Sequence, residues 1–123
     1  KHYPFRVIKT IFAVTIRFGN NRIAKQLADA STIKKSFGLM AKKVAMRLDD
    51  IRAAPNLAIL KQLPQAGCHE LKGNRAGEWA VSISGNHRLI FLLAHNPLPR
   101  KQDGSVDEIM INEIIVTGTE DYH

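Results

Sequence analysis

The chain has 123 residues, a net charge of +7 and one cysteine. This length suits a single domain with one modest core and is too short for two. The apolar content of 45% is that of a globular protein. No apolar run reaches the roughly 18 residues that a membrane span requires. One thiol excludes an intramolecular disulfide and a zinc site built on several cysteines, and it fits the reducing conditions of the cytoplasm.

The charge is unevenly distributed along the chain. Residues 1–62 hold most of the basic side chains, whereas residues 101–123 hold Lys101 against a series of Asp and Glu. A basic surface attracts polyanions, of which nucleic acid is the most common. The charge pattern is equally compatible with a solvated helix face. The charges of Arg6, Lys9 and Arg17 inside the first apolar stretch argue against a signal peptide, so we expect a cytoplasmic protein.

The first half of the chain predicts one strand followed by two helices. Residues 14–18 alternate apolar with polar, which favours a strand, and a helix over about 21–29 follows. A second helix is expected from a cap at Ser31 or Thr32 to about residue 53. Its apolar residues recur at steps of three and four, while its basic residues lie off that stripe. The basic residues are Lys34, Lys35, Lys42, Lys43 and Arg47.

After Pro55 the apolar period changes from helical to alternating. Residues 78–84 alternate, Gly85-Asn86 is a turn signal, and residues 89–93 are apolar on both faces, which is typical of a central strand. A polar loop over 96–105 precedes a last strand near 111–117. This order predicts an α+β domain with helices packed on one face of a mainly antiparallel sheet.

Most enzyme templates are absent from the sequence. The segment 73–77 is rich in glycine but lacks the Lys-Ser or Lys-Thr of a phosphate-binding loop, and there is no HExxH motif. The five histidines show no metal-site spacing, so neither a metal nor a cofactor is expected. The residues that remain are cations and groups that transfer protons. They are His69, Lys72, Arg75, Arg88, Tyr122 and His123.

That set suits metal-independent cleavage of RNA. In this reaction the ribose 2′-OH is the nucleophile, so it needs a base, cations around the phosphorane and an acid for the leaving 5′-oxygen. Histidine serves as base or acid near neutral pH, and Arg and Lys stabilise charge on phosphoryl oxygens. Tyrosine can stack on a base or donate a proton. The composition permits this reaction without demonstrating it.

Three segments resemble HigB-type toxins, which are also called plasmid maintenance killer proteins. Residues 68–79 are similar to the family signature in which His, Leu-Lys-Gly, Arg, Gly and an aromatic residue follow at fixed spacing. Residues 88–91 resemble the family's Arg-initiated strand, and Asp121-Tyr122-His123 resembles its terminal motif. The resemblance covers about residues 14–123, and residues 1–13 are an N-terminal extension without a recognised counterpart. At position 87, where an aromatic residue is expected, the chain has His87.

The resemblance implies a RelE-like fold and the toxin of a type II toxin-antitoxin system. Such a toxin enters the ribosomal A site, contacts ribosomal RNA and cuts messenger RNA, which inhibits translation. A HigA-like helix-turn-helix antitoxin is the implied partner. Residue by residue, the implied catalytic positions are His69, Lys72, Arg88, Tyr122 and His123, with Asp121 in a supporting role. Candidates for RNA contact are Lys34, Lys35, Lys42, Lys43 and Arg75.

Two alternatives remain open at this level. A ParE-like toxin shares the fold but poisons DNA gyrase without cutting RNA, and an inactive paralogue would only bind an antitoxin. A fold alone does not separate these functions. Codon preference, the identity of the antitoxin and the oligomeric state are not encoded in any pattern of this sequence. We expect His69, Lys72, Arg88 and His123 to meet on one face of the sheet.

Overall fold

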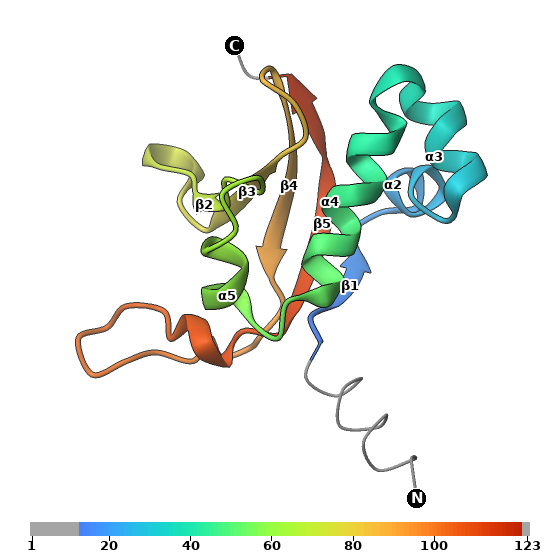
Figure 1. The fold of residues 1–123 in the computed structure, drawn as a ribbon. Coiled ribbons are helices and arrows are strands. Elements are labelled where there is room, and N and C mark those ends of the chain that lie inside the picture. The colour runs from blue at the N-terminus through green and yellow to red at the C-terminus, as the bar shows by residue number, and fades with distance from the viewer. Residues whose placement is uncertain (1–12, 122–123) are drawn as a thin grey trace, which may run out of the picture.

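The computed structural model describes residues 13–121, which form one sheet with helices against it (Figure 1). The strands are β1 (Thr15–Phe18), β2 (His69–Glu70), β3 (Glu78–Ser82), β4 (His87–Leu93) and β5 (Glu113–Asp121). The α-helices are α2 (Asn21–Gln26), α3 (Ala30–Phe37), α4 (Ala41–Ala53) and α5 (Leu57–Lys61). Three short 3-10 helices are η1 (Gly38–Met40), η2 (Gly73–Arg75) and η3 (Glu108–Met110).

The five strands are arranged in the order β1-β5-β4-β3-β2. β1 pairs with β5 in parallel, and every other neighbouring pair is antiparallel. The expected α+β fold, with a mainly antiparallel sheet, is therefore confirmed. β4 lies in the interior of the sheet, between β3 and β5. Its residues Leu89 and Phe91 belong to the main core, and Ile90 is buried in a small cluster on the other face.

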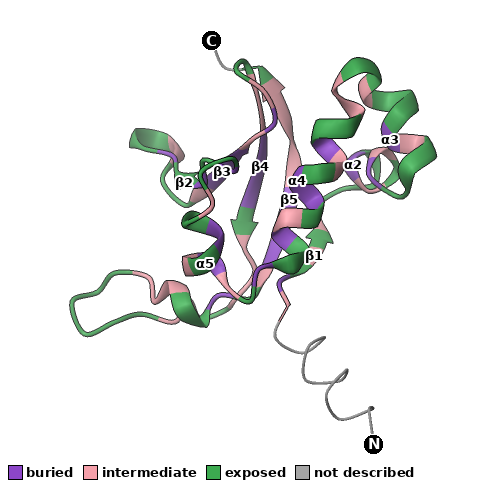
Figure 2. Ribbon diagram, in the orientation of Figure 1, coloured by how far each residue is buried: buried purple, intermediate pink, exposed green. Residues whose placement is uncertain are grey.

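One face of the sheet forms the core with the helices. Val44, Leu48 and Ile51 of α4 are almost fully buried, and Leu57 and Leu60 of α5 extend the same layer. From the sheet, the inward residues of β3, β4 and β5 meet them, including Trp79 and Phe91, whose rings stack at a centroid distance of 6.4 Å. Figure 2 shows this buried layer between α4, α5 and the strands. The apolar alternation of the strands thus defines the helix-covered face.

The helical region differs from the sequence prediction in its boundaries. The first helix ends at Gln26, and Asp29 begins the next one by accepting the backbone N–H of Thr32. The predicted cap at Ser31 or Thr32 was wrong because Thr32 instead completes a capping box with Asp29. The predicted continuous helix to residue 53 was also wrong. Gly38, at φ +54°, ends α3, and η1 turns the chain into α4.

Two further features were not anticipated. α5 and the two-residue strand β2 are too short to produce a periodic pattern. Arg47, which was expected off the apolar stripe, is buried. It donates to the carbonyl of Ser82 at 2.5 Å and to Asp50 Oδ2 at 2.6 Å, so it fastens α4 to the end of β3. Within residues 13–121, no helix is long and apolar enough to cross a membrane.

A β-bulge in β5 determines which side chains reach the other face of the sheet. Ile90 pairs with Gly118 while the next residue, Phe91, pairs with Val116, so Thr117 is the extra residue. Without the bulge, Glu120 would have the same orientation as Val116 and point into the core. The bulge shifts the alternation by one residue and places Glu120 opposite Arg88, on the face away from the helices.

Candidate functional site

The face of the sheet opposite the helices carries the candidate site, and we call it the open face. No helix among residues 13–121 packs on it. Its apolar part is a small cluster of Leu71, Ala80 and Ile90. The strand register places Arg88, Glu120 and His69 around that cluster, on the same face. Three of the chain's elements, β2, β4 and β5, therefore contribute polar side chains to one surface.

Two arginines and two glutamates form a continuous ion-pair network on the open face. Arg75, from the end of η2, donates to both carboxylate oxygens of Glu78 at 2.9 and 3.0 Å. The same guanidinium donates to both oxygens of Glu120 at 2.8 and 3.2 Å. Arg88 donates from Nε to Glu120 at 2.8 Å and pairs through Nη2 at 2.6 Å. Glu120 therefore fixes the positions of both guanidinium groups.

The network determines the protonation of its carboxylates. Hydrogen bonds from Arg75 lower the pKa of Glu78 below its ordinary value. Hydrogen bonds from Arg75 and then Arg88 likewise lower the pKa of Glu120. Both carboxylates are ionised at neutral pH, and a carboxylate of low pKa is a weak general base. Glu120 is thus suited to positioning the arginines rather than to moving protons.

The strand register places His69, whose imidazole can accept or donate a proton, on the open face. It pairs with Ala80 across β2 and β3 and is exposed. Its Nδ1 lies 2.9 Å from the carbonyl oxygen of Gly67. A carbonyl only accepts, so Nδ1 carries the proton, and Nε2 is left to accept a proton when the ring is neutral. His69 lies in the same row as Ile90, roughly 10 Å away across two strand spacings.

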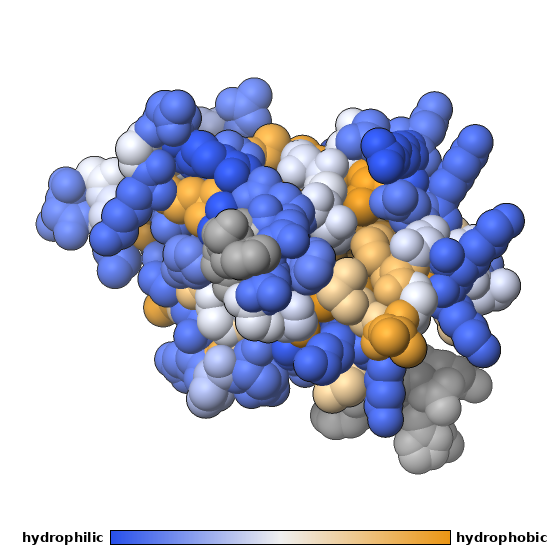
Figure 3. All heavy atoms as spheres, turned by 90° about the horizontal axis from the view of Figure 1, so that it is seen from above, coloured by the Kyte–Doolittle hydropathy of each residue, from blue (hydrophilic) through white to orange (hydrophobic). Residues whose placement is uncertain are grey.

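The remaining predicted cations are exposed. Lys72 lies in the chain between Leu71 of the open-face cluster and η2, and it forms no ion pair with any residue from 13 to 121. The same holds for the four lysines of the helical region, Lys34, Lys35, Lys42 and Lys43. They lie on α3 and α4, away from the open face. In Figure 3, hydrophilic side chains surround an apolar patch on that side of the molecule.

Asp121 is not brought to the network, and two predicted residues lie outside the described range. The register pairs Asp121 with His87, and both lie on the same side of the sheet as Leu89, which faces the helices. The His87 Nε2 atom is 3.8 Å from Asp121 Oδ2. Tyr122 and His123 fall beyond residue 121, so their proposed roles stay predictions. The open face thus groups His69, Arg75 and Arg88.

Sequence reasoning missed the two carboxylates that organise the site. Glu78 was interpreted as an ordinary strand residue, and Glu120 was placed beyond the last predicted strand, which in the structure extends to Asp121. A signal for Glu78 was present, because it lies three residues after Arg75. Glu120 had none, because its face depends on the bulge. Elsewhere, burial raises the pKa of the Cys68 thiol to about 12, so it stays protonated and unreactive. Within residues 13–121, no cluster of three or more His, Cys, Asp and Glu side chains could hold a metal ion.

The chain is structurally similar to solved toxin structures. One is a YoeB/ParE toxin from Agrobacterium tumefaciens, with 13% identity and a TM-score of 0.47 over 89% of this chain and 100% of that one. Another is YafQ from E. coli strain BL21(DE3), with 15% identity and a TM-score of 0.44 over 88% of this chain and 92% of that one. A YafQ mutant from E. coli matches at 16% identity, with the same TM-score and coverage. No family model and no curated protein matches the sequence. At these identities and TM-scores the similarities assign no activity to this chain.

Proposed function

We propose that this chain is the toxin of a type II toxin-antitoxin system and cuts messenger RNA in the ribosome. The observation that supports this most is the grouping of His69, Arg75 and Arg88 on the open face, with exposed Lys72 three residues after His69 in the chain. These are the side chains that metal-independent cleavage of RNA requires. The strand register puts His69 and Arg88 on the open face, and the shared bonds to Glu120 hold Arg75 beside Arg88.

The proposed reaction begins with the ribose 2′-OH, which attacks the neighbouring phosphorus. His69 accepts the 2′-OH proton at Nε2, since its Nδ1–H is already donated to Gly67. Arg88 and Lys72 stabilise the negative charge of the phosphorane. The bond from phosphorus to the 5′-oxygen then breaks, and His123 protonates that oxygen. The products are a 2′,3′-cyclic phosphate and a 5′-OH, and Tyr122 stacks on a neighbouring base.

Glu120 holds the two arginines together. It pairs with both Arg75 and Arg88, so two closely spaced cations are held without mutual repulsion. A phosphate is a bidentate acceptor like a carboxylate, so a scissile phosphate can take over donors that Glu120 holds. The guanidinium groups are then oriented before the substrate arrives, which lowers the cost of assembling the transition state.

The helix-covered side supports binding to the ribosome. Lys34, Lys35, Lys42 and Lys43 project from α3 and α4 without ion pairs to any residue from 13 to 121. In the A site a small protein is surrounded by RNA, so these lysines contact ribosomal RNA while the open face holds the message. A HigA-like helix-turn-helix antitoxin is the proposed inhibitory partner.

The test is cleavage of a defined message in a translating extract, with cut sites mapped by primer extension. The parent chain should cut the message. Lys72→Gln should slow cutting roughly 10²-fold, the usual loss when one stabilising donor is removed. Lys25→Gln is the matched control, because Lys25 is also exposed and forms no ion pair with any residue from 13 to 121, but lies on α2. It should cut at the parent rate.

The alternatives predict different results. A message left intact by the parent chain contradicts the proposal. DNA breaks in a gyrase assay would then favour the gyrase poison, and inactivity in both assays would favour the antitoxin-binding paralogue. Equal rates for Lys72→Gln and the parent would remove Lys72 from the proposed site while leaving the activity itself in place.

A further inference from the structure

A cavity of about 670 Å³ lies at the other end of the sheet from the His87–Asp121 pair. The connection from β4 to β5 builds one wall: Arg100 bridges to Val106, Lys101 N–H donates to the Ser105 carbonyl, and Leu98 and Val106 pack against the core. β3 and β4 build the other wall. Its volume is in the range of sites that enclose most of a small molecule.

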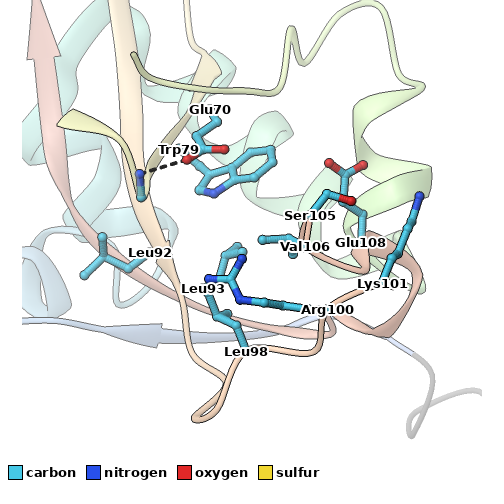
Figure 4. Close-up of a pocket in the computed structure, with 11 residues that line it drawn as sticks. Glu70, Trp79, Leu92, Leu93, Leu98, Arg100, Lys101, Ser105, Val106 and Glu108 are labelled. Atoms are coloured by element: carbon cyan, nitrogen blue, oxygen red, sulfur yellow. Dashed lines mark hydrogen bonds between the residues drawn. The ribbon is translucent and has the colours of Figure 1, made fainter. Parts of the chain in front are cut away.

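The floor of this cavity is apolar but carries one unused donor. Trp79, Leu93, Leu98 and Val106 line it. The indole N–H of Trp79 has no hydrogen-bond partner among residues 13–121. Figure 4 shows the side chain of Arg100 extending from the loop across the cavity, toward the indole. A flat apolar group would fit against the floor, and an acceptor would satisfy the indole N–H.

Two cations of the lining, Arg100 and Lys101, can bind an anion at the cavity. Glu108 is neutralised by Lys61, whose ammonium is 3.0 Å away and also lies 5.6 Å from the centroid of Trp79. Arg100 uses one donor on the carbonyl of Gly104. A guanidinium has five donors, so most of them remain available to a ligand. Lys101, at the rim, forms no ion pair with any described residue.

Glu70 is the remaining charged residue of the lining, and it suggests which ring the cavity prefers. One of its oxygens accepts the backbone N–H of Gly77 at 2.9 Å, and no cation pairs with it among residues 13–121. A carboxylate in such a position accepts from an exocyclic amino group, as Glu and Asp do with cytosine. Adenine, cytosine and guanine carry that group, and uracil does not.

We propose that this cavity binds a nucleoside monophosphate whose base carries an exocyclic amine, with the phosphate on Arg100 and Lys101. The source is either a free nucleotide or one nucleotide of an RNA strand. The proposal rests on the cavity alone and does not require the chain to cut RNA. Trp79 is the single tryptophan of the chain, so its fluorescence reports binding at this site without a label.

The experiment titrates the full chain with AMP, CMP and UMP while Trp79 fluorescence is recorded. Adenosine, which lacks the phosphate, and ribose 5-phosphate, which lacks the base, are the probes for each half of the ligand. AMP and CMP should produce a saturable change, with both half-ligands and UMP at least about tenfold weaker, since each loses a hydrogen bond to a charged group. A short RNA that displaces AMP would identify the strand as the source, and failure to displace it would identify the free nucleotide.

Variants test the assigned contacts. Lys101→Gln should weaken AMP about tenfold. It should leave the loop intact, because Asp103 of the loop is held mainly by hydrogen bonds from Ser105 rather than by the Lys101 charge. Arg100→Lys should weaken AMP as well, since it keeps the charge but loses the planar fork. Glu70→Gln should remove the preference for AMP over UMP, and Lys25→Gln should change nothing. The proposal is overturned by the absence of a saturable AMP signal. It is also overturned if adenosine binds as tightly as AMP, or if Lys101→Gln and Arg100→Lys both bind AMP like the parent.

Discussion

Arg88 has a structural contact and a proposed catalytic one. Its side chain is 15% exposed and pairs with Glu120, so a loss on mutation can reflect either the fold or the reaction. The two effects differ in size. A partly exposed ion pair contributes on the order of 1 kcal/mol or less to folding, whereas a donor aimed at a transition state contributes several times as much to the rate. Measuring both quantities on the same variants separates them.

Arg88→Ala should lower the cleavage rate on ribosomes roughly 10²-fold or more, with a loss of about 1 kcal/mol in the free energy of unfolding. Arg88→Lys keeps the charge but loses the Nε donor to Glu120, so its cleavage rate should lie between those of Arg88→Ala and the parent. The measurements are single-turnover cleavage and denaturant unfolding. Arg88→Ala cleaving at the parent rate would leave the arginine with a structural role only.

Glu120 makes folding depend on pH. Its pKa is lowered in the folded chain by Arg75 and Arg88, so its ionised form favours folding above the ordinary Glu pKa of about 4.3. That contribution is lost as the pH falls through the lowered folded-state value. Glu120→Gln should therefore be less stable than the parent by about 1 kcal/mol at pH 7, because the side chain is 29% exposed and its ion pairs are screened.

The same variant should converge with the parent in acid. Below the lowered folded-state pKa of Glu120, both chains have a neutral side chain at position 120, so the difference in free energy of unfolding should vanish. Glu70→Gln is the control, because Glu70 bonds a backbone N–H rather than a cation. A constant difference between Glu120→Gln and the parent from pH 7 to pH 3 would mean that the ion pairs are not the cause.

At the scale of elements, the break between α3 and α4 depends on one glycine. Gly38 has φ +54° and ψ −120°, a conformation that residues with a Cβ rarely adopt. A Cβ built there meets no atom within 4 Å, so a substitution is opposed by backbone strain and not by crowding. This break turns the basic α3 back against α4, and the two helices contact each other closely.

Gly38→Ala should lower the free energy of unfolding by about 1–3 kcal/mol, the usual cost of a strained backbone conformation. Gly85→Ala is the matched control, since Gly85 also has open space around its Cβ position but no left-handed φ. It should change stability by less than about 1 kcal/mol. If Gly38→Ala and Gly85→Ala lower the free energy of unfolding equally, a Cβ at position 38 does not strain the backbone, which would contradict the prediction.

The sequence predicted those elements whose pattern is periodic. The alternation around Trp79 and the doubly apolar stretch of β4 predicted β3 and an interior strand, because burial imposes period two on strands. The break between α3 and α4 was not predicted, because one glycine with positive φ leaves the apolar period of the sequence almost unchanged. The face of Glu120 was not predictable either. A one-residue bulge at Thr117 reverses every later side chain, and no residue type encodes it.

The candidate site, like the fold, could be predicted from the sequence only in part. The positions of His69 and Arg88 were expected to converge from the resemblance, and the register places both on the open face. Their partners were not expected, because an ion pair between residues 32 apart in sequence depends on the strand register. Asp121 was expected to support the site but lies on the opposite face of the sheet. It directly follows Glu120 in β5, and successive side chains of a strand point to opposite faces.

At the scale of the whole molecule, basic side chains lie on two different sides. The lysines of α3 and α4 lie on the helical side, and the proposed reaction occurs on the open face. Replacing Lys34, Lys35, Lys42 and Lys43 with Gln should weaken co-sedimentation with ribosomes at low salt. The deficit should shrink as salt rises, because these charges act through screened attraction and release of counterions.

The control for that variant is Arg22→Gln with Lys25→Gln, which removes two exposed charges of α2. It should sediment nearly as the parent does. A deficit of the fourfold variant that is the same at low and high salt would mean that the lysines act through specific contacts or through the fold. An unchanged affinity at both salt concentrations would assign ribosome binding to another surface.

The central claim is that the chain cuts ribosome-bound message by attack of a ribose 2′-OH. The most direct measurement uses a ribosome complex with a synthetic message in which the single nucleotide 5′ of the cut carries 2′-deoxyribose. The account predicts rapid cutting of the all-ribose message on the ribosome, no cutting of the 2′-deoxy message, and little cutting of either one free in solution. Equal cutting of the 2′-deoxy and all-ribose messages, or of free and ribosome-bound message, would contradict it.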